Sequence, residues 1–231
     1  MLTADAFCGI DDYNYIYSFK NSSIIKSGTS DTYRFSDLTL GNPTSLDILN
    51  PLKLVAFYEM TQTVIILDNK LSEITRVNFN NLEEPILATH ARQAGDRKLW
   101  LFNADTQAVL IFDYQRNATV INFQPEMKSI IGMASDFNNC WTTNDTTLTH
   151  YNNYGIILEK HPIADVQHIQ SSDEKLILYS GEKWLFMDAE NKTFVPIDLP
   201  VIDVQSFSFI GDTLHIYDGK QLSTFKITRT N

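Results

Sequence analysis

The sequence predicts an all-β protein, and three observations lead to this prediction. Short apolar runs alternate with polar or Gly, Pro and Asn turns, and no segment keeps helical i, i+3, i+4 spacing over ten residues. Residues 53–68, KLVAFYEMTQTVIILD, align without a gap with residues 98–113, KLWLFNADTQAVLIFD. Residues 162–167, PIADVQ, return as PVIDVQ at 200–205. These two repeats indicate a fold built from similar units of about 40 residues.

Each unit is predicted to contain four short strands, and the 53–68 stretch is the middle pair of one unit. The strands predicted for units one to three are 6–10, 13–19, 23–26, 32–35, 45–49, 52–58, 63–67, 74–79, 86–90, 98–102, 109–112 and 119–123. Those predicted for units four to six are 130–135, 139–143, 147–151, 156–159, 166–169, 175–179, 184–187, 194–197, 204–209, 213–217 and 222–227. The sixth unit therefore shows three strands.

Four short strands per unit are typical of a β-propeller blade. One blade cannot bury both faces of its small sheet, whereas a ring of blades packed side by side can. We therefore predict a single β-propeller domain over residues 1–231 with six four-stranded blades. Five or seven blades remain alternatives, because the first and fourth units are weakly marked. The N-terminal stretch Leu2–Phe7 is expected to close the ring as the outermost strand of the sixth blade.

Composition and charge restrict the partners and the location. With 43% hydrophobic and 20% charged residues, the chain is an ordinary globular protein. Its net charge of −10 argues against a nucleic-acid partner. No apolar run approaches the roughly 18 residues that a membrane span needs. The N-terminus lacks the basic start and apolar centre of a signal peptide. The protein is expected to be either cytoplasmic or a mature exported chain whose leader has been replaced by Met1.

The first strand of each propeller blade lines the central channel, so polar residues on these strands are the candidates for a site. They are Asp47, His90, Ser135, Asp165, His168, Asp203 and Ser206. An enzyme or glycan-binding propeller would gather several at the channel mouth, with Asp47, His90 and His168 as the candidate ligand-binding residues. The alternative is a structural role, in which Asp165 and Asp203 are turn residues whose side chains accept hydrogen bonds from nearby backbone N–H groups. It is favoured because these two recur at equivalent repeat positions, whereas a catalytic residue is usually unique.

Other recurring residues are also predicted to have structural roles. Four aspartates each follow an apolar strand and are predicted to cap hairpin turns: Asp68, Asp113, Asp188 and Asp218. Three tryptophans on second or third strands are expected to pack between blades: Trp100, Trp141 and Trp184.

The sequence offers no recognisable catalytic or cofactor motif. Neither Cys8 nor Cys140 lies in a CxxC or Cys/His cluster, so both are predicted to be small buried thiols. There is no GxSxG, P-loop, EF-hand loop or HExxH sequence. We expect no metal, no other cofactor and no enzymatic activity.

Residues 50–53, NPLK, and residues 64–74, VIILDNKLSEI, resemble a family of small exported β-propellers of Bacteroidota. The family pattern is an N-P-x-K strand, an apolar strand ending in L-D-N, and then L-x-E-I. The resemblance is clear over residues 45–80 and carries over no catalytic residue. It implies a periplasmic location, and a similar small periplasmic protein acts as the plug that closes the type 9 secretion translocon.

The resulting expectation is a non-catalytic interaction protein. It would be a periplasmic, plug-like subunit of an outer-membrane secretion or assembly complex, with a protein partner such as an outer-membrane translocon. The alternative is a propeller enzyme or glycan-binding protein that uses the channel mouth.

Overall fold

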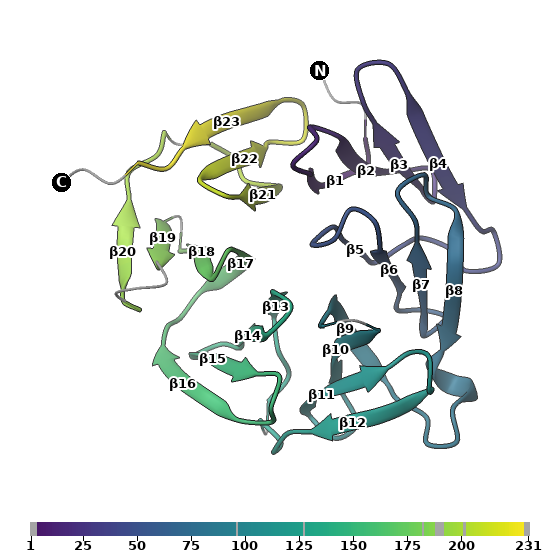
Figure 1. Cartoon of the computed structure of the whole chain (residues 1–231). Helices are drawn as coiled ribbons and strands as arrows, with labels where there is room; N and C mark the ends of the chain where they lie inside the picture. Colours follow the sequence, from purple (N-terminus) through teal and green to yellow (C-terminus); the bar gives the residue numbers. More distant parts are fainter. Residues whose placement is uncertain are drawn as a thin grey trace.

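The computed structural model describes residues 4–95, 97–126, 128–181, 183–187, 192–200 and 202–228. Figure 1 shows six antiparallel sheets arranged in a ring, each with its first strand innermost. Within the described ranges, the one helical element is a 3₁₀ turn, Phe79–Asn81, and no helix is long and apolar enough to span a membrane. The chain is therefore a six-bladed β-propeller, which confirms the fold that the repeats predict.

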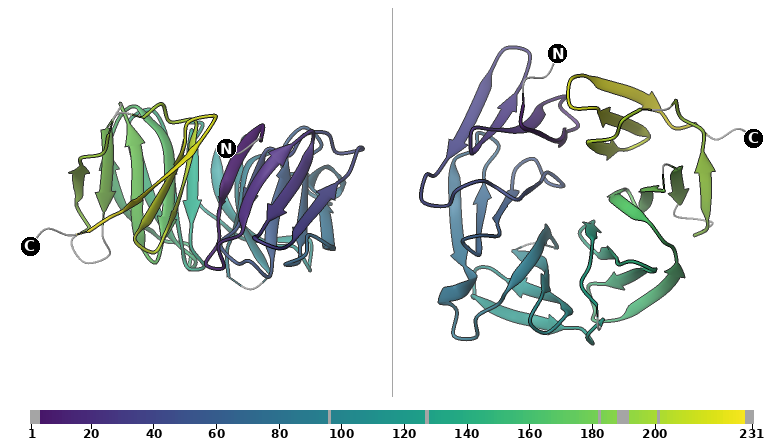
Figure 2. Two further views of the ribbon diagram at one scale, coloured as in Figure 1. Left: turned by 90° about the horizontal axis from the view of Figure 1, so that it is seen from above. Right: turned by 180° about the vertical axis from the view of Figure 1, so that it is seen from behind.

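Consecutive strands pair within each blade. Blades one to three contain β1 (Ala6–Ile10), β2 (Ile16–Lys20), β3 (Ser23–Ser27), β4 (Thr32–Ser36), β5 (Ser45–Asp47), β6 (Leu54–Tyr58), β7 (Thr63–Leu67), β8 (Glu73–Asn78), β9 (Ala88–Gln93), β10 (Lys98–Asn103), β11 (Ala108–Asp113) and β12 (Ala118–Asn122). Blades four to six contain β13 (Gly132–Ser135), β14 (Asn139–Thr143), β15 (Thr147–Asn152), β16 (Ile157–Pro162), β17 (Val166–Ser172), β18 (Lys175–Ser180), β19 (Lys183–Met187), β20 (Phe194–Ile197), β21 (Ser206–Ile210), β22 (Thr213–Tyr217) and β23 (Leu222–Lys226). The side view in Figure 2 shows these strands running between the two faces of a flat ring.

The duplicated stretch forms the same hairpin in blades two and three. Leu54 pairs with Leu67 across β6 and β7, and Leu99 pairs with Phe112 across β10 and β11. The turn residues Gln62 and Gln107 both adopt a left-handed backbone, with φ of 50° and 52°. The repeat is thus the middle two strands of a blade, as predicted.

The hydrophobic core is divided among the interfaces between neighbouring blades. Trp100 is buried in the cluster that joins blades three and four, and Trp141 in the one that joins blades four and five. Trp184 is buried between blades five and six. The prediction that the tryptophans pack between blades is confirmed. Each blade buries both faces of its sheet only by contacting two neighbours, which is why the ring is needed.

The ring closes at the N-terminal strand, but not by the predicted strand pairing. Ala6 and Phe7 belong to β1, the innermost strand of blade one, where Ala6 pairs with Phe19 of β2. They are therefore not in an outermost strand of blade six, which has three described strands, β21 to β23. Leu2 and Thr3 lie outside the described residues. Closure uses side chains, because Phe7 and Ile10 pack on Tyr217 of blade six.

Gly9 allows β1 to approach both neighbouring blades closely. It lies at a bulge in β1 with φ of 153°, in the region that favours glycine. A Cβ atom at this position would lie 2.6 Å from Ile48 Cδ1 of blade two and 3.0 Å from Ser208 Oγ of blade six. The absence of a side chain at this position therefore lets the first strand fit between the second and last blades.

One buried amide joins blade two to blade three. Gln62 Nε2 donates to the carbonyl of Ala88 at 2.9 Å, and the N–H of Ala88 donates to Gln62 Oε1 at 2.7 Å. The side chain of Gln62 is only 6% exposed. It therefore pairs with β9 as the backbone of a neighbouring strand would.

Replacing Gln62 with alanine should destabilise the propeller far more than the same change at Gln107. Both residues occupy the same turn position with nearly the same φ, so the backbone effect is matched. Gln62→Ala would leave the buried N–H and carbonyl of Ala88 without partners, at a cost of roughly 2–4 kcal/mol. Urea unfolding of the two variants would measure the difference, and equal free energies of unfolding would contradict the amide bridge.

Candidate functional site

The central channel contains a cavity of about 470 Å³, within the range of small-molecule sites. The innermost strands of the blades line it, together with loop residues such as Asp12, Leu49 and Pro51. Its polar lining includes six serines, one arginine and one histidine: Ser45, Ser135, Ser171, Ser172, Ser206, Ser208, Arg92 and His168. The channel is therefore the natural place to test the sequence candidates.

Several of these serines join neighbouring innermost strands. Ser135 Oγ donates to the carbonyl of Gln93 at 2.9 Å, and Ser171 Oγ donates to the carbonyl of Ser135 at 2.9 Å. Ser206 Oγ donates to the carbonyl of Phe7 at 3.1 Å, across the closure of the ring. Each bond satisfies a backbone carbonyl of the adjacent blade. The hydroxyl protons of these three serines are thus used to hold blades together.

Gln170 makes the corresponding link between blades five and six. Its Nε2 donates to the carbonyl of Phe207 at 2.8 Å, and the N–H of Phe209 donates to its Oε1 at 2.8 Å. Farther along the same two strands, the N–H of Gly211 donates to Ser172 Oγ at 2.9 Å. The two links advance together along both strands, so β17 and β21 run in the same direction through the ring.

Asp47 lines the cavity, but both of its carboxylate oxygens are occupied. The N–H of Gln93 in β9 donates to Oδ2 at 2.7 Å, and the N–H of Leu49 donates to Oδ1 at 2.9 Å. Asp47 therefore ties blade two to blade three and caps its own strand.

The two candidate histidines lie in different surroundings. His168 lines the cavity with its ring edge-on to Phe207, and burial lowers the pKa of its imidazole. His90 lies outside the cavity lining, beside Thr89 Oγ1 at 3.1 Å. Burial, followed by the charge of Arg92, lowers the pKa of His90 to about 4. The structure thus brings Asp47 and His168 to the cavity and leaves His90 out of it.

The repeated aspartates fall into two groups, because among the described residues no backbone N–H group donates to the carboxylate of Asp165 or Asp203, contrary to the predicted turn role of these two. Ser135 and Ser206 line the cavity, whereas Asp165 and Asp203 do not. Asp165 has a left-handed backbone with φ of 56°, and its carbonyl accepts the N–H of Gly181. The Oδ1 atoms of three strand-ending aspartates each accept two backbone N–H groups, which confirms the predicted turn role of Asp68, Asp113 and Asp218. Asp188 lies outside the described residues.

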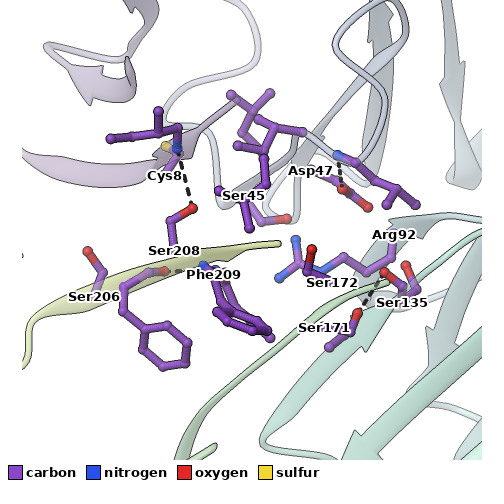
Figure 3. Close-up of a pocket in the computed structure, with 18 of the residues that line it drawn as sticks. Cys8, Ser45, Asp47, Arg92, Ser135, Ser171, Ser172, Ser206, Ser208 and Phe209 are labelled. Atoms are coloured by element: carbon purple, nitrogen blue, oxygen red, sulfur yellow. Dashed lines mark hydrogen bonds between the residues drawn. The ribbon is translucent and has the colours of Figure 1, made fainter. Parts of the chain in front are cut away.

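Arg92 is one of the cavity residues that the sequence did not reveal, as are Ser45, Ser171, Ser172 and Ser208. The predicted strand ends at residue 90, but β9 continues to Gln93 and places Arg92 on the channel. Its Nε donates to the carbonyl of Met133 in blade four at 3.0 Å. Figure 3 shows its guanidinium group directed into the cavity, where Ser45 and Ser172 also point. The predicted strand was bounded by its apolar residues, so it did not include the polar residues at the end of β9.

Both cysteines are free thiols. Cys140 is buried, as predicted, whereas Cys8 is half-buried at the edge of the cavity. Burial raises the pKa of both thiols, and this outweighs the opposite effect of the charge of Arg92. Among the described residues, no group of three or more His, Cys, Asp or Glu side chains is arranged to hold a metal ion.

Comparison with known proteins supports the fold. No protein-family model and no curated protein matches the sequence. Among solved structures, PorZ of Porphyromonas gingivalis, an essential bacterial surface component of the type-IX secretion system, matches with a TM-score of 0.58 and 12% identity. The match covers 97% of this chain but only 37% of the PorZ chain. This chain therefore corresponds in length to about a third of PorZ.

Two lyases have similar propellers. A streptogramin B lyase matches with a TM-score of 0.67 and 11% identity over 99% of this chain and 85% of the lyase. An inactive virginiamycin B lyase of Staphylococcus aureus with quinupristin matches with a TM-score of 0.66 and 10% identity over 98% and 86% of the two chains. At these identities the likeness shows the fold alone. The class of protein is a β-propeller whose structural neighbours include a type IX secretion component and lyases.

The lowered pKa of the half-buried His90 predicts a loss of stability in mild acid. Between about pH 6.5 and pH 4 the unfolded chain binds a proton at this site more readily than the folded chain. The free energy of unfolding should therefore fall as the pH falls through this window. Over the same pH range, the free energy of unfolding of His90→Gln should fall by roughly 1–3 kcal/mol less than that of the wild type. Denaturant unfolding at several pH values tests this, and parallel curves for both proteins would contradict it.

Proposed function

We propose that this propeller is a non-catalytic interaction protein that binds a protein partner in an outer-membrane secretion machinery of the type IX kind. The proposal includes a periplasmic location and a plug-like role, as the sequence resemblance to small exported propellers implies. The structural likeness to PorZ, a component of the type-IX secretion system, supports the broader part of it. The observation that carries it is that the exposed large aromatic side chains of the described residues, Tyr13, Phe137 and Tyr154, all come from loops on one face of the ring.

Four large, exposed side chains come from loops on the same face. Tyr13 and Leu52 lie in loops that join the first and second strands of blades one and two, and are 71% and 63% exposed. Phe137, in the equivalent loop of blade four, is 41% exposed, and Tyr154, between the third and fourth strands, is 83% exposed. Because successive blades repeat the same strand directions, all of these loops lie on one side of the ring, which we call face A. Aromatic side chains are enriched at protein-binding surfaces.

The hydrogen bonds of the channel residues also support a non-catalytic role. Asp47, Ser135, Ser171 and Ser206 are engaged by the backbones of adjacent blades or of their own turn. They are therefore not free to act together as acid, base and nucleophile, which a catalytic site requires.

Removing the apolar side chains of face A should weaken partner binding. In the organism that makes the protein, Tyr13→Ser with Leu52→Ser should lower the amount of crosslinked partner by about tenfold or more, because buried aromatic anchors dominate interfaces. The measurement is crosslinking in intact cells, affinity purification and quantitative mass spectrometry. The expected partners are outer-membrane components of the secretion machinery.

The matched control lies on the opposite face. Met60 is 92% exposed in the loop between the second and third strands of blade two, and Leu38 is 91% exposed between blades one and two. Met60→Ser with Leu38→Ser should leave the crosslinked partner unchanged. Equal losses in both double variants, or no secretion component in the wild-type sample, would overturn the proposal.

A further inference from the structure

The channel contains hydrogen-bond donors that have no acceptor among the residues that the structure describes. Arg92 uses its Nε to donate to Met133, which fixes the plane of the guanidinium group. Its two Nη groups make no hydrogen bond or ion pair with any residue that the structure describes. Figure 3 shows this end of the side chain extending into the cavity. A guanidinium group presents a fork of donors that matches a carboxylate.

Three serine hydroxyls of the same cavity also have a proton to donate. Ser172 Oγ and Ser208 Oγ each accept a backbone N–H, from Gly211 at 2.9 Å and from Ile10 at 3.3 Å. A hydroxyl that accepts one bond can still donate another. Ser45 Oγ has no hydrogen-bond partner in the described part of the chain. These serines come from blades two, five and six, so the donors surround the cavity.

The carboxylates of the channel do not neutralise Arg92. Both oxygens of Asp47 accept backbone N–H groups, and Asp11 accepts the hydroxyl of Tyr17 and lies 3.8 Å from Lys26 Nζ. Two exposed carboxylates, Asp12 and Asp173, lie in loops that line the cavity. Their charge, with the net charge of −10, opposes the entry of a multiply charged anion. A ligand with a single negative charge fits this balance.

Part of the lining is apolar. Ile48, Leu49 and Ile210 line the cavity and are half-buried, so they leave apolar surface accessible. A space of about 470 Å³ accommodates the body of a small ligand next to its charged group.

We propose that the channel binds a small organic acid. Its single carboxylate accepts from the two Nη groups of Arg92 and from the hydroxyls of Ser45, Ser172 or Ser208. Its mainly apolar body packs on the accessible apolar lining, which includes Ile48, Leu49 and Ile210. This site lies inside the channel, next to the partner surface of face A, and the proposal does not require that a partner binds there.

The test compares acids with their uncharged amides. Isothermal calorimetry would measure the binding of butanoate, octanoate, phenylacetate and phenylbutanoate, each paired with its primary amide, to the wild-type protein. At least one acid should bind at millimolar or lower concentration, and its amide should bind roughly tenfold to a hundredfold more weakly, because bonds to charged groups are worth about 1.5–3 kcal/mol. Absence of binding by all four acids, or equal affinity of acid and amide, would overturn the proposal.

Three variants locate the site. Arg92→Gln should weaken the acid by roughly tenfold or more while leaving the amide unchanged. Ser45→Ala should weaken the acid by roughly twofold to tenfold, and it disturbs no existing hydrogen bond if Arg92→Gln proves unstable. Arg116→Gln removes an exposed charge outside the cavity and should change nothing. If both Arg92→Gln and Ser45→Ala bind the acid as the wild type does, the acid binds elsewhere and the proposed site is contradicted. If Arg92→Gln does not fold, unchanged acid binding in Ser45→Ala alone contradicts the site.

Discussion

The structure depends on side chains that replace backbone pairing between the innermost strands. The sheets of a propeller radiate from the channel, so the inner edge of each sheet exposes N–H and C=O groups that its own blade cannot pair. Such groups are costly if they are left unsatisfied away from water. Here Ser135, Ser171 and Ser206 donate to carbonyls, Asp47 accepts an N–H, and Gln170 does both. Polar residues on the inner strands are therefore part of the scaffold.

Within each blade, the middle strands differ from the innermost strand, which depends on partners from a neighbouring blade. The middle strands β6, β7 and β11 are buried at every position, because both faces of the sheet contact neighbouring blades. The interface between blades six and one is different, since its buried apolar cluster within the described chain is limited to Phe7, Ile10 and Tyr217. Hydrogen bonds of Ser206 and Ser208 to β1 reinforce that interface. Among the described residues, ring closure thus has a smaller buried apolar cluster than the other interfaces.

This division explains which parts of the structure could be predicted from the sequence. Strand β7 is predicted at its observed bounds, because a continuous apolar run followed by an aspartate turn is a local pattern. The inner strands β9 and β17 continue three residues beyond the predicted ends, to Gln93 and Ser172. Their last residues are polar and are held by partners distant in sequence, which no local pattern shows. Arg92 and Ser172 were missed for this reason, and His90 was preferred although it lies outside the cavity lining.

The proposed ligand site and the proposed partner surface meet at the mouth of the channel. Asp12 and Pro51 line the cavity, and the next residues in the chain, Tyr13 and Leu52, are two of the exposed anchors of face A. A protein bound to those anchors would cover the cavity mouth, and an acid in the cavity would lie directly beneath the same two loops. If each occupant changes the conformation or exposure of these loops, the two affinities must be coupled, and by thermodynamic necessity the coupling acts equally in both directions. Because lining residue and anchor residue are neighbours in the chain, such coupling would act through these two loops.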